Sequence, residues 1–226
     1  MNQLGELITA CQQDIADTKG VEANKLIKQS EWTRFANAME IEACRRAYLL
    51  KDSSTLVLCR VEAQALNPVL RLDDRVILVN RVAYFSDGSI LPKTRLDLMD
   101  AQMGSGWENE TDTPTNWLEG MDTGAIRLYP CPPINITFRL TVTRQPLRPM
   151  AKLTDVMEIN SRYFEALVAG MLSMAYNKQD VEIIKDLPRS MQKLAVFTEE
   201  FGPKRSARTE QFASEYLGLD PFEGQA

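Results

Sequence analysis

The sequence contains no histidine among its 226 residues. Histidine is the commonest general acid or base in enzymes and a frequent ligand of bound metals. Its absence excludes Ser-His-Asp and Cys-His catalysis, as well as zinc sites that need an imidazole nitrogen. Several large enzyme classes are therefore ruled out by composition.

Cysteine is sparse, and its spacing carries no motif. The four residues are Cys11, Cys44, Cys59 and Cys131, and no two of them form a CxxC pair. A zinc site built from four thiolates is not expected, and so few cysteines in a chain of this length do not indicate a disulfide framework. We expect buried, reduced thiols.

Long apolar runs, basic leaders and glycine-rich phosphate loops are also missing. No window of about 18 apolar residues is present, so we expect no membrane span. The N-terminus carries Glu6 and no basic stretch, which is not the pattern of a signal peptide, so we expect folding in a cytoplasm. Neither GxxxxGK[ST] nor GxGxxG occurs, so we expect no nucleotide cofactor.

The charge balance is acidic, with 26 basic and 31 acidic residues and a net charge of −5. A broad basic surface for nucleic acid is not expected, although an acidic wall would let DNA slide past it. The acidic residues cluster at Asp97, Asp100, Glu108, Glu110 and Asp112. Paired carboxylates can hydrolyse glycosides, but we favour a solvated or ion-binding loop and assign no catalytic, cofactor or metal residue.

Two segments alternate between apolar and polar residues, which indicates half-buried antiparallel strands. One predicted face holds Ile126, Leu128, Phe138, Leu140 and Val142. The other holds Arg127, Arg139, Thr141 and Thr143. Proline cannot donate to a strand ladder, so Pro130, Pro132 and Pro133 mark the connection between them.

The rest of residues 55–143 also follows a period of two. Strands are predicted over 56–61, 69–72 and 75–85. Asp87-Gly88 is typical of a hairpin turn, which predicts that a strand returns at Ile90-Leu91. Residues 104–115 are polar and aperiodic, so we expect a long loop.

Helices are predicted at both ends of the chain. The predicted ranges are 3–17, 31–50 with Ser30 as N-cap, 162–177 opened by Asn160-Ser161, and 181–201 capped by Asp180, with Pro188 as a kink or restart. In the last helix the residues expected to face inward are Val181, Ile184, Leu187, Met191, Leu194, Ala195 and Phe201. Charged residues of the second helix, Arg45 and Arg46 among them, are expected on a solvated or subunit-facing surface.

These patterns predict an α+β protein. N- and C-terminal helices form a four-helix bundle, an antiparallel β domain is inserted between them, and an extended C-terminal tail follows. The expected parts are residues 1–52, 53–150, 151–202 and 203–226. Small residues at Ala166, Ala169, Gly170 and Ser173 would let a second helix approach the third one closely.

Several residues are candidates for contacts with other proteins. Trp107 and Trp117 bracket the long loop, and an interface role and core packing are equally open for them. Arg139, Arg144 and Arg148 are placed to pair with acids on a neighbouring subunit or tail protein. The tail carries spaced hydrophobes that would anchor it in a partner's grooves, unless it is merely frayed: Phe212, Tyr216, Leu217 and Phe222.

The order of the elements, together with short motifs, resembles one known family. The motifs are RVILVNRV at 75–82, the Asp87-Gly88 turn, PTNW at 114–117, IRLYPCP at 126–132 and TRQPL at 143–147. Over about residues 1–205 the chain resembles the head-to-tail adaptor (connector) proteins of tailed bacteriophages, in particular of short-tailed phages.

This resemblance implies a structural virion protein without catalysis. Such adaptors form a ring, commonly a dodecamer, between the capsid portal protein and the tail tube or nozzle, with DNA passing through the lumen. It also implies that Phe212, Tyr216, Leu217 and Phe222 contact the portal. Alternatives are another tail-completion or neck ring protein, a cytoplasmic ligand-binding module, and a carboxylate-based hydrolase.

Overall fold

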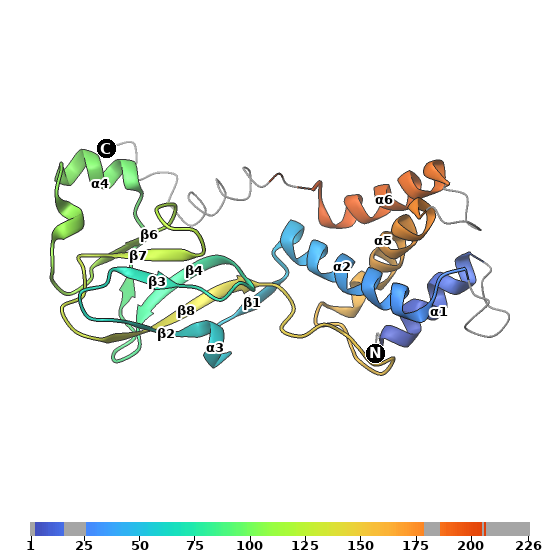
Figure 1. Ribbon diagram of the computed structural model, residues 1–226, viewed down its shortest axis with the longest axis horizontal. Coiled ribbons are helices and arrows are strands. Elements are labelled where there is room, and N and C mark those ends of the chain that lie inside the picture. Colours follow the sequence, from blue (N-terminus) through green and yellow to red (C-terminus); the bar gives the residue numbers. More distant parts are fainter. Residues whose placement is uncertain (1–2, 16–25, 179–185, 205, 207–226) are drawn as a thin grey trace. The chain divides into compact units, whose positions relative to one another are not determined.

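The long helices and the sheets fall into two different units of the chain (Figure 1). The structure is a computed structural model that describes residues 3–15, 26–178, 186–204 and 206. Unit 1 comprises Met1–Leu50 and Gln145–Lys204, and unit 2 comprises Lys51–Arg144 and Arg205–Ala226. The α+β class expected from the sequence is confirmed, and each unit is described below by itself.

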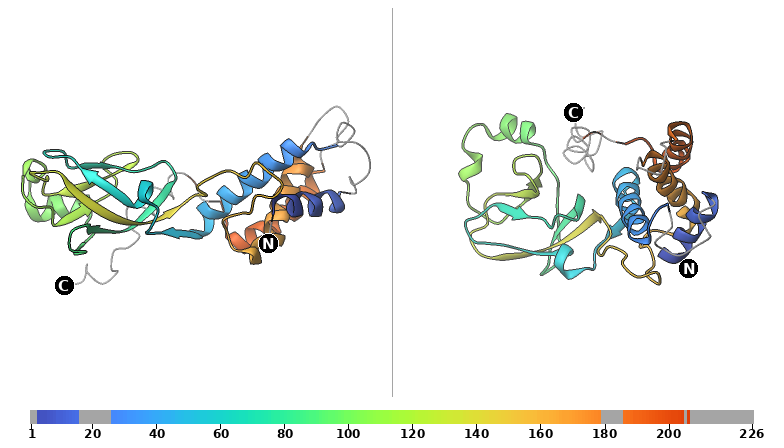
Figure 2. Two further views of the ribbon diagram at one scale, coloured as in Figure 1. Left: turned by 90° about the horizontal axis from the view of Figure 1, so that it is seen from below. Right: turned by 45° about the vertical axis from the view of Figure 1, so that its right-hand side comes forward.

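Unit 1 is built from helices that share one apolar core. They are α1 (Leu4–Asp14), α2 (Gln29–Ala47), the 3-10 turn η3 (Ser161–Tyr163), α5 (Phe164–Asn177) and α6 (Leu187–Phe201). The views in Figure 2 show α1, α2, α5 and α6 side by side, with α5 packed against the other three. Leu4, Leu7, Ile8 and Cys11 form one buried stripe on α1, and Asn160 Oδ1 accepts a hydrogen bond from the Arg162 N–H, which opens the third helix as expected.

The small residues of α5 permit a close approach, as the sequence predicts. A Cβ atom added at Gly170 would lie 2.6 Å from Phe197 Cδ2 of α6 and 2.8 Å from Met39 Sδ of α2. Phe197 is fully buried at this point. Gly170 therefore sets how closely α6 and α2 pack on α5.

The prediction for the inward face of α6 is confirmed at Phe201 and wrong at the other described positions. Leu187, Met191 and Leu194 are exposed, whereas Ser190, Phe197 and Phe201 are buried. The Phe197 ring seats over Gly170, and the Ser190 hydroxyl donates to the Ser173 carbonyl at 2.8 Å. These two contacts turn the apolar stripe of α6 partly toward solvent. Val181, Ile184 and the expected cap Asp180 lie outside the described residues, and the helix that is described begins beside Pro188 with Asp186 as its N-cap.

Helix α2 differs from its prediction at both ends. It begins one residue before Ser30, with Lys28 as N-cap, and the Lys28 N–H donates to Glu31 Oε2 at 3.2 Å. It ends at Ala47, because Tyr48 adopts a left-handed conformation with φ 52°. Arg46, expected at the surface, is buried and donates to the Gly202 carbonyl at 3.0 Å. The prediction of a surface position for Arg46 is wrong, because its guanidinium donates to the carbonyl at the C-terminal end of α6.

Unit 2 contains two antiparallel sheets. Its strands are β1 (Leu50–Asp52), β2 (Arg60–Ala63), β3 (Val69–Arg71), β4 (Val76–Tyr84), β5 (Ile90–Leu91), β6 (Asn116–Leu118), β7 (Ala125–Tyr129) and β8 (Ile136–Arg144). One sheet has the order β1-β8-β4-β5, with β2 also paired to β8, and the other has the order β3-β7-β6. The two segments of strongest alternation, β7 and β8, thus belong to different sheets.

The predicted strand over 56–61 is replaced at its start by a short helix, α3 (Leu56–Cys59). The Asp52 carboxylate accepts hydrogen bonds from the N–H groups of Ser54 and Thr55, at 2.9 and 3.0 Å. The Thr55 carbonyl then accepts from the Leu58 and Cys59 N–H groups. A side-chain oxygen that satisfies N–H groups at this point favours a helical turn over a strand.

Most other features of unit 2 agree with the sequence. The Asp87-Gly88 turn joins β4 and β5, with Gly88 at φ 76°, and the apolar face of β7 and β8 is buried. Thr143, expected on the polar face, is buried because its hydroxyl accepts a hydrogen bond from Asn80 Nδ2 at 2.9 Å.

Two further short helical elements in unit 2, in addition to α3, were not expected from the sequence. They are the helix α4 (Leu96–Met103) and the 3-10 turn η2 (Trp107–Asn109), which interrupts the predicted loop. Within the described ranges, no helix combines the length and apolarity needed to cross a bilayer.

Candidate functional site

Two exposed arginines face each other across neighbouring strands of unit 2. Arg60 opens β2, Arg139 lies within β8, and the two are direct register partners. Alternation explains the placement of Arg139, because its neighbours Phe138 and Leu140 are fully buried. Phe85 follows β4 and is fixed beside them by the hydrogen bond from its N–H to the Thr137 carbonyl, at 3.0 Å. We call Arg60, Phe85 and Arg139 the arginine platform.

Both guanidinium groups of the platform stack on one aromatic ring. The Cζ atoms of Arg60 and Arg139 lie 4.4 and 5.3 Å from the centroid of the Phe85 ring. Each cation–π contact contributes about 0.5–1 kcal/mol at an exposed site. The ring therefore holds the two cations in place although they repel each other, as like charges directly opposite on paired strands do.

The platform is cationic and open to a partner. Among the residues that the structure describes, neither Arg60 nor Arg139 forms an ion pair, and Glu62 on the same strand lies beyond ion-pair distance from both. Planar guanidiniums suit bidentate recognition of carboxylates. A carboxylate supplied by another protein would relieve the repulsion between them.

Arg144, which was also predicted as a contact residue, is used within its own chain. Its Nε atom donates to Asp52 Oδ2 at 2.7 Å, and both side chains are largely buried. Burial disfavours ionisation of Asp52, but hydrogen bonds from Thr55, Ser54 and Arg144 outweigh it and hold the pKa of this carboxyl well below its usual range. Arg148 is exposed, and its N–H donates to Glu158 Oε1 at 3.4 Å.

The two tryptophans with an open assignment both pack in the core of unit 2. Trp107 is 3% exposed and meets Tyr129 edge-on, with ring centroids 5.5 Å apart. Trp117 is 2% exposed, and its indole N–H donates to the Leu91 carbonyl at 3.1 Å. Core packing is the alternative that these positions support.

The acidic cluster is tied up in local structure. Asp100 accepts a hydrogen bond from the Trp107 indole N–H at 2.9 Å, and Glu108 forms an ion pair with Arg127 at 3.3 Å. Glu110 accepts a hydrogen bond from the Tyr129 hydroxyl, which raises the pKa of Tyr129 to about 12. No cluster of histidine, cysteine or acidic residues suited to a metal ion is found in the described part of the chain.

All four cysteines are buried thiols without a disulfide, as the sequence predicts. Burial raises the pKa of Cys11 to about 12 and that of Cys59 to about 11. Very little of either thiol is the reactive thiolate near neutral pH.

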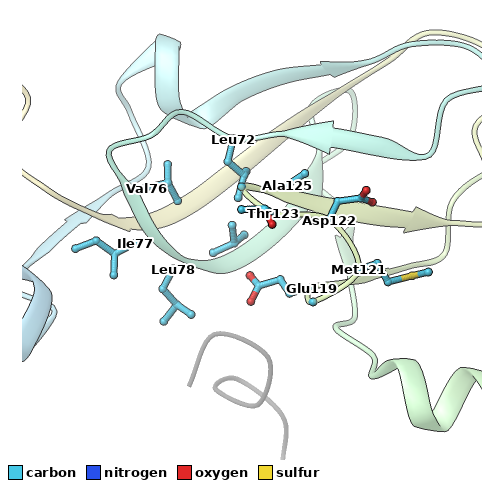
Figure 3. Close-up of a pocket in the computed structure, with 12 residues that line it drawn as sticks. Leu72, Val76, Ile77, Leu78, Glu119, Met121, Asp122, Thr123 and Ala125 are labelled. Atoms are coloured by element: carbon cyan, nitrogen blue, oxygen red, sulfur yellow. The ribbon is translucent and has the colours of Figure 1, made fainter. Parts of the chain in front are cut away.

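Unit 2 also contains a pocket of about 330 Å³ between the turn that joins β3 to β4 and the segment 119–125 (Figure 3). Apolar side chains form one wall: Leu72, Val76, Ile77 and Leu78. The lining also includes Met121 and Ala125, of which Ala125 lies beside Leu72, and the Glu119 carboxylate is paired with Lys93 Nζ at 3.2 Å. No sequence pattern indicated this pocket, because it joins segments that lie far apart in the chain.

The predicted portal-contact residues, Phe212, Tyr216, Leu217 and Phe222, lie outside the described residues. Of these four residues, only Phe212 lies within the range that matches a known protein family. The model of one protein family, described as SU10 adaptor protein, matches residues 2–215. No curated protein matches the chain significantly.

Proposed function

This chain belongs to the SU10 adaptor protein family, and on that premise we propose that it forms a ring between the capsid portal and the tail of a phage. The observation that carries the proposal is the family match over residues 2–215, which includes the described residues of both units. Membership makes the chain a phage structural adaptor protein of the virion. Beyond family membership, we propose that the chain forms a ring, that the ring has twelve copies and that the phage is short-tailed.

In this proposal, the helical parts pack side by side around a DNA channel, and the inserted β domain faces outward or toward the tail tube or nozzle. The tail residues Phe212, Tyr216, Leu217 and Phe222 dock on the portal. The net charge of −5 supports passage of DNA without tight phosphate contacts.

The arginine platform is the proposed contact with a partner's carboxylates. Its two guanidiniums are exposed, fixed on Phe85 and without an acidic partner among the described residues. We assign this role to Arg60 and Arg139 and not to Arg144, because Arg144 is held by Asp52.

A structural role without catalysis fits the chemistry of the site residues. The sequence has no histidine, and Asp100, Glu108 and Glu110 each bind a neighbouring side chain. These carboxylates thus brace unit 2 around Trp107 and Tyr129, which is a different task from activating water.

Electron microscopy of the purified chain, alone and mixed with the portal complex from the same phage, tests the proposal. We expect a ring stacked on the portal. Arg139→Glu should weaken attachment to the tail or to the neighbouring subunit, whereas Arg71→Glu, an exposed change on β3, serves as the matched control. A chain that remains a monomer and does not bind the portal under assembly conditions would refute the adaptor ring.

A further inference from the structure

Two joined loops of unit 2 form an exposed surface without any charged side chain. They are residues 64–68, between β2 and β3, and residues 130–135, between β7 and β8. The Leu66 N–H donates to the Pro132 carbonyl at 2.8 Å, and the Ala65 N–H donates to Asn135 Oδ1 at 2.8 Å, so the loops are joined. We call their exposed residues the knob: Gln64, Ala65, Leu66, Asn67, Pro133, Ile134 and Asn135.

The knob presents two large aliphatic side chains to solvent. Leu66 is 72% exposed and Ile134 is 65% exposed. Leu66 also adopts a left-handed backbone conformation with φ 61°, which costs a leucine roughly 1–2 kcal/mol. Asparagine or glycine would occupy this turn position with less strain. A strained, exposed leucine contributes little to the fold of unit 2, which points to a contact outside it.

The pocket of Figure 3 lies at the other end of the strand pair that leads to the knob. Strand β3 leaves the knob at Val69 and reaches the pocket at Leu72, while β7 starts in the pocket at Ala125 and runs back to Tyr129 beside the knob. Leu72, Val76 and Ile77 in its wall are only half-buried. The apolar knob and the partly apolar pocket therefore lie at the two ends of one short antiparallel strand pair.

We propose that the knob of one copy of this chain inserts into the pocket of the next copy. The knob and the pocket are two different surfaces of the chain, so a contact between them is heterologous, and such contacts close into a ring when the rotation between copies allows it. The inference rests on the ring of the proposed function and assigns its side chains: Leu66 and Ile134 of one copy contact Leu72, Val76 and Ile77 of its neighbour.

The chemistry of both surfaces favours this occupant. On insertion, Leu66 and Ile134 would be removed from water and would pack against the apolar side chains of the pocket. Because the knob is uncharged, it would place no second charge beside Asp122, which is exposed at the pocket. Depletion of charged residues is typical of interface cores. Nucleic acids fit the knob poorly, because their phosphates are recognised through lysine and arginine, which the knob lacks.

Three variants test the contact, and the first of them separates contact from folding. Leu66→Asn relieves the backbone strain, so its melting temperature should equal or exceed that of the wild type, while the concentration needed for ring assembly on the portal rises at least tenfold. Leu72→Glu places a charge in the pocket and should raise the concentration needed for ring assembly by a similar factor. Ile77→Thr is a milder change in the same pocket and should raise it less. When the Leu66→Asn and Leu72→Glu chains are mixed, each retains one intact surface, so pairs should form and rings should not.

Cross-linking tests the contact directly. The double variant Leu66→Cys with Leu72→Cys should give a ladder of covalent oligomers after mild oxidation. Asp87→Cys with Leu72→Cys, which moves the first thiol to the exposed tip of the β4–β5 turn, should give none. The native cysteines interfere little because all four are buried.

Other outcomes overturn the inference in distinguishable ways. If wild-type rings form but neither variant weakens them and no ladder appears, the inference fails and the proposed function stands. If Leu66→Asn alone weakens assembly, the knob binds a different protein. If the pocket variants lose their effect in a chain that ends at residue 206, residues 207–226 occupy the pocket instead. If the wild type forms no ring on the portal, both proposals fail.

Discussion

The Asp52 carboxylate accepts a hydrogen bond from Arg144 Nε at 2.7 Å, and this pair joins the two points where the chain enters and leaves unit 2. Asp52 ends β1 and Arg144 ends β8, and these two strands are neighbours in the sheet. The same carboxylate accepts hydrogen bonds from Ser54 and Thr55 ahead of α3. One buried ion pair thus closes the boundary of the inserted segment.

Loss of this carboxylate is expected to destabilise unit 2 strongly. Asp52→Ala removes the ion pair and the hydrogen bonds ahead of α3, and breaking a buried pair by removing one partner costs roughly 3 kcal/mol. Urea denaturation measures the change. Asp73→Ala, which removes the more exposed pair with Arg75, is the control and should cost less than about 1 kcal/mol. Equal losses in the two variants would show that Asp52 has no special role.

The same pair predicts a dependence on acidity. Because the folded-state pKa of Asp52 lies well below its unfolded value, its stabilisation is complete above the unfolded pKa, which is about 3.9. It is lost as the pH falls from there through the folded pKa. Melting temperatures between pH 6 and pH 2 should therefore fall less steeply for Asp52→Ala than for the wild type, and parallel curves would contradict this.

Glu40 of α2 should behave in the opposite way. It is buried, and its Oε1 atom accepts hydrogen bonds from the Glu158 and Ile159 N–H groups at 2.6 and 3.3 Å. Burial outweighs these bonds and raises the pKa of Glu40, so the ionised group costs stability as the pH rises from its unfolded pKa through the folded one.

Glu40→Gln keeps an acceptor without the charge, so its melting temperature relative to the wild type should be higher at pH 7 than at pH 4. Glu42→Gln, on the same helix, is the control, because Glu42 pairs with Arg46 and should lose stability at pH 7. A shift for Glu40→Gln that is the same at both pH values would contradict the assignment.

The approach of α6 to α5 makes Gly170 intolerant of a side chain. A Cβ atom at this position would crowd the buried Phe197 ring, and such overpacking costs about 1–3 kcal/mol, of which the better helix propensity of alanine recovers up to about 1 kcal/mol. We therefore expect Gly170→Ala to lower the free energy of unfolding. Ala195→Gly, at an exposed site on α6, measures helix propensity alone. A stabilised Gly170→Ala variant would show that the helices have room to move apart.

The two arginines of the platform should lower the stability of the folded chain slightly, because they repel each other. Arg60→Gln removes one of two like charges in direct register but also one cation–π contact, so the net rise in its free energy of unfolding should not exceed about 0.5 kcal/mol at low salt. The difference should vanish at high salt, which screens exposed charges. Arg71→Gln is the control without such a partner. A loss of stability at low salt would mean that stacking on Phe85 outweighs the repulsion.

Local patterns in the sequence determined the elements whose contacts are themselves local. The stripe of α1, the alternation of β7 and β8 and the Asp87-Gly88 turn follow from the periods of helix and strand and from a preference for positive φ at Gly88. The absence of histidine likewise excluded imidazole chemistry without any structure.

Tertiary structure decided every feature that depends on a distant segment. The apolar stripe of α6 did not show that Phe197 must seat over Gly170, and the spacing of Arg46 did not show that it reaches Gly202. Arg60 and Arg139 become neighbours only through the register of β2 with β8. Periodicity reports which residues share a face, whereas packing between elements selects the face that is buried and the charges that meet.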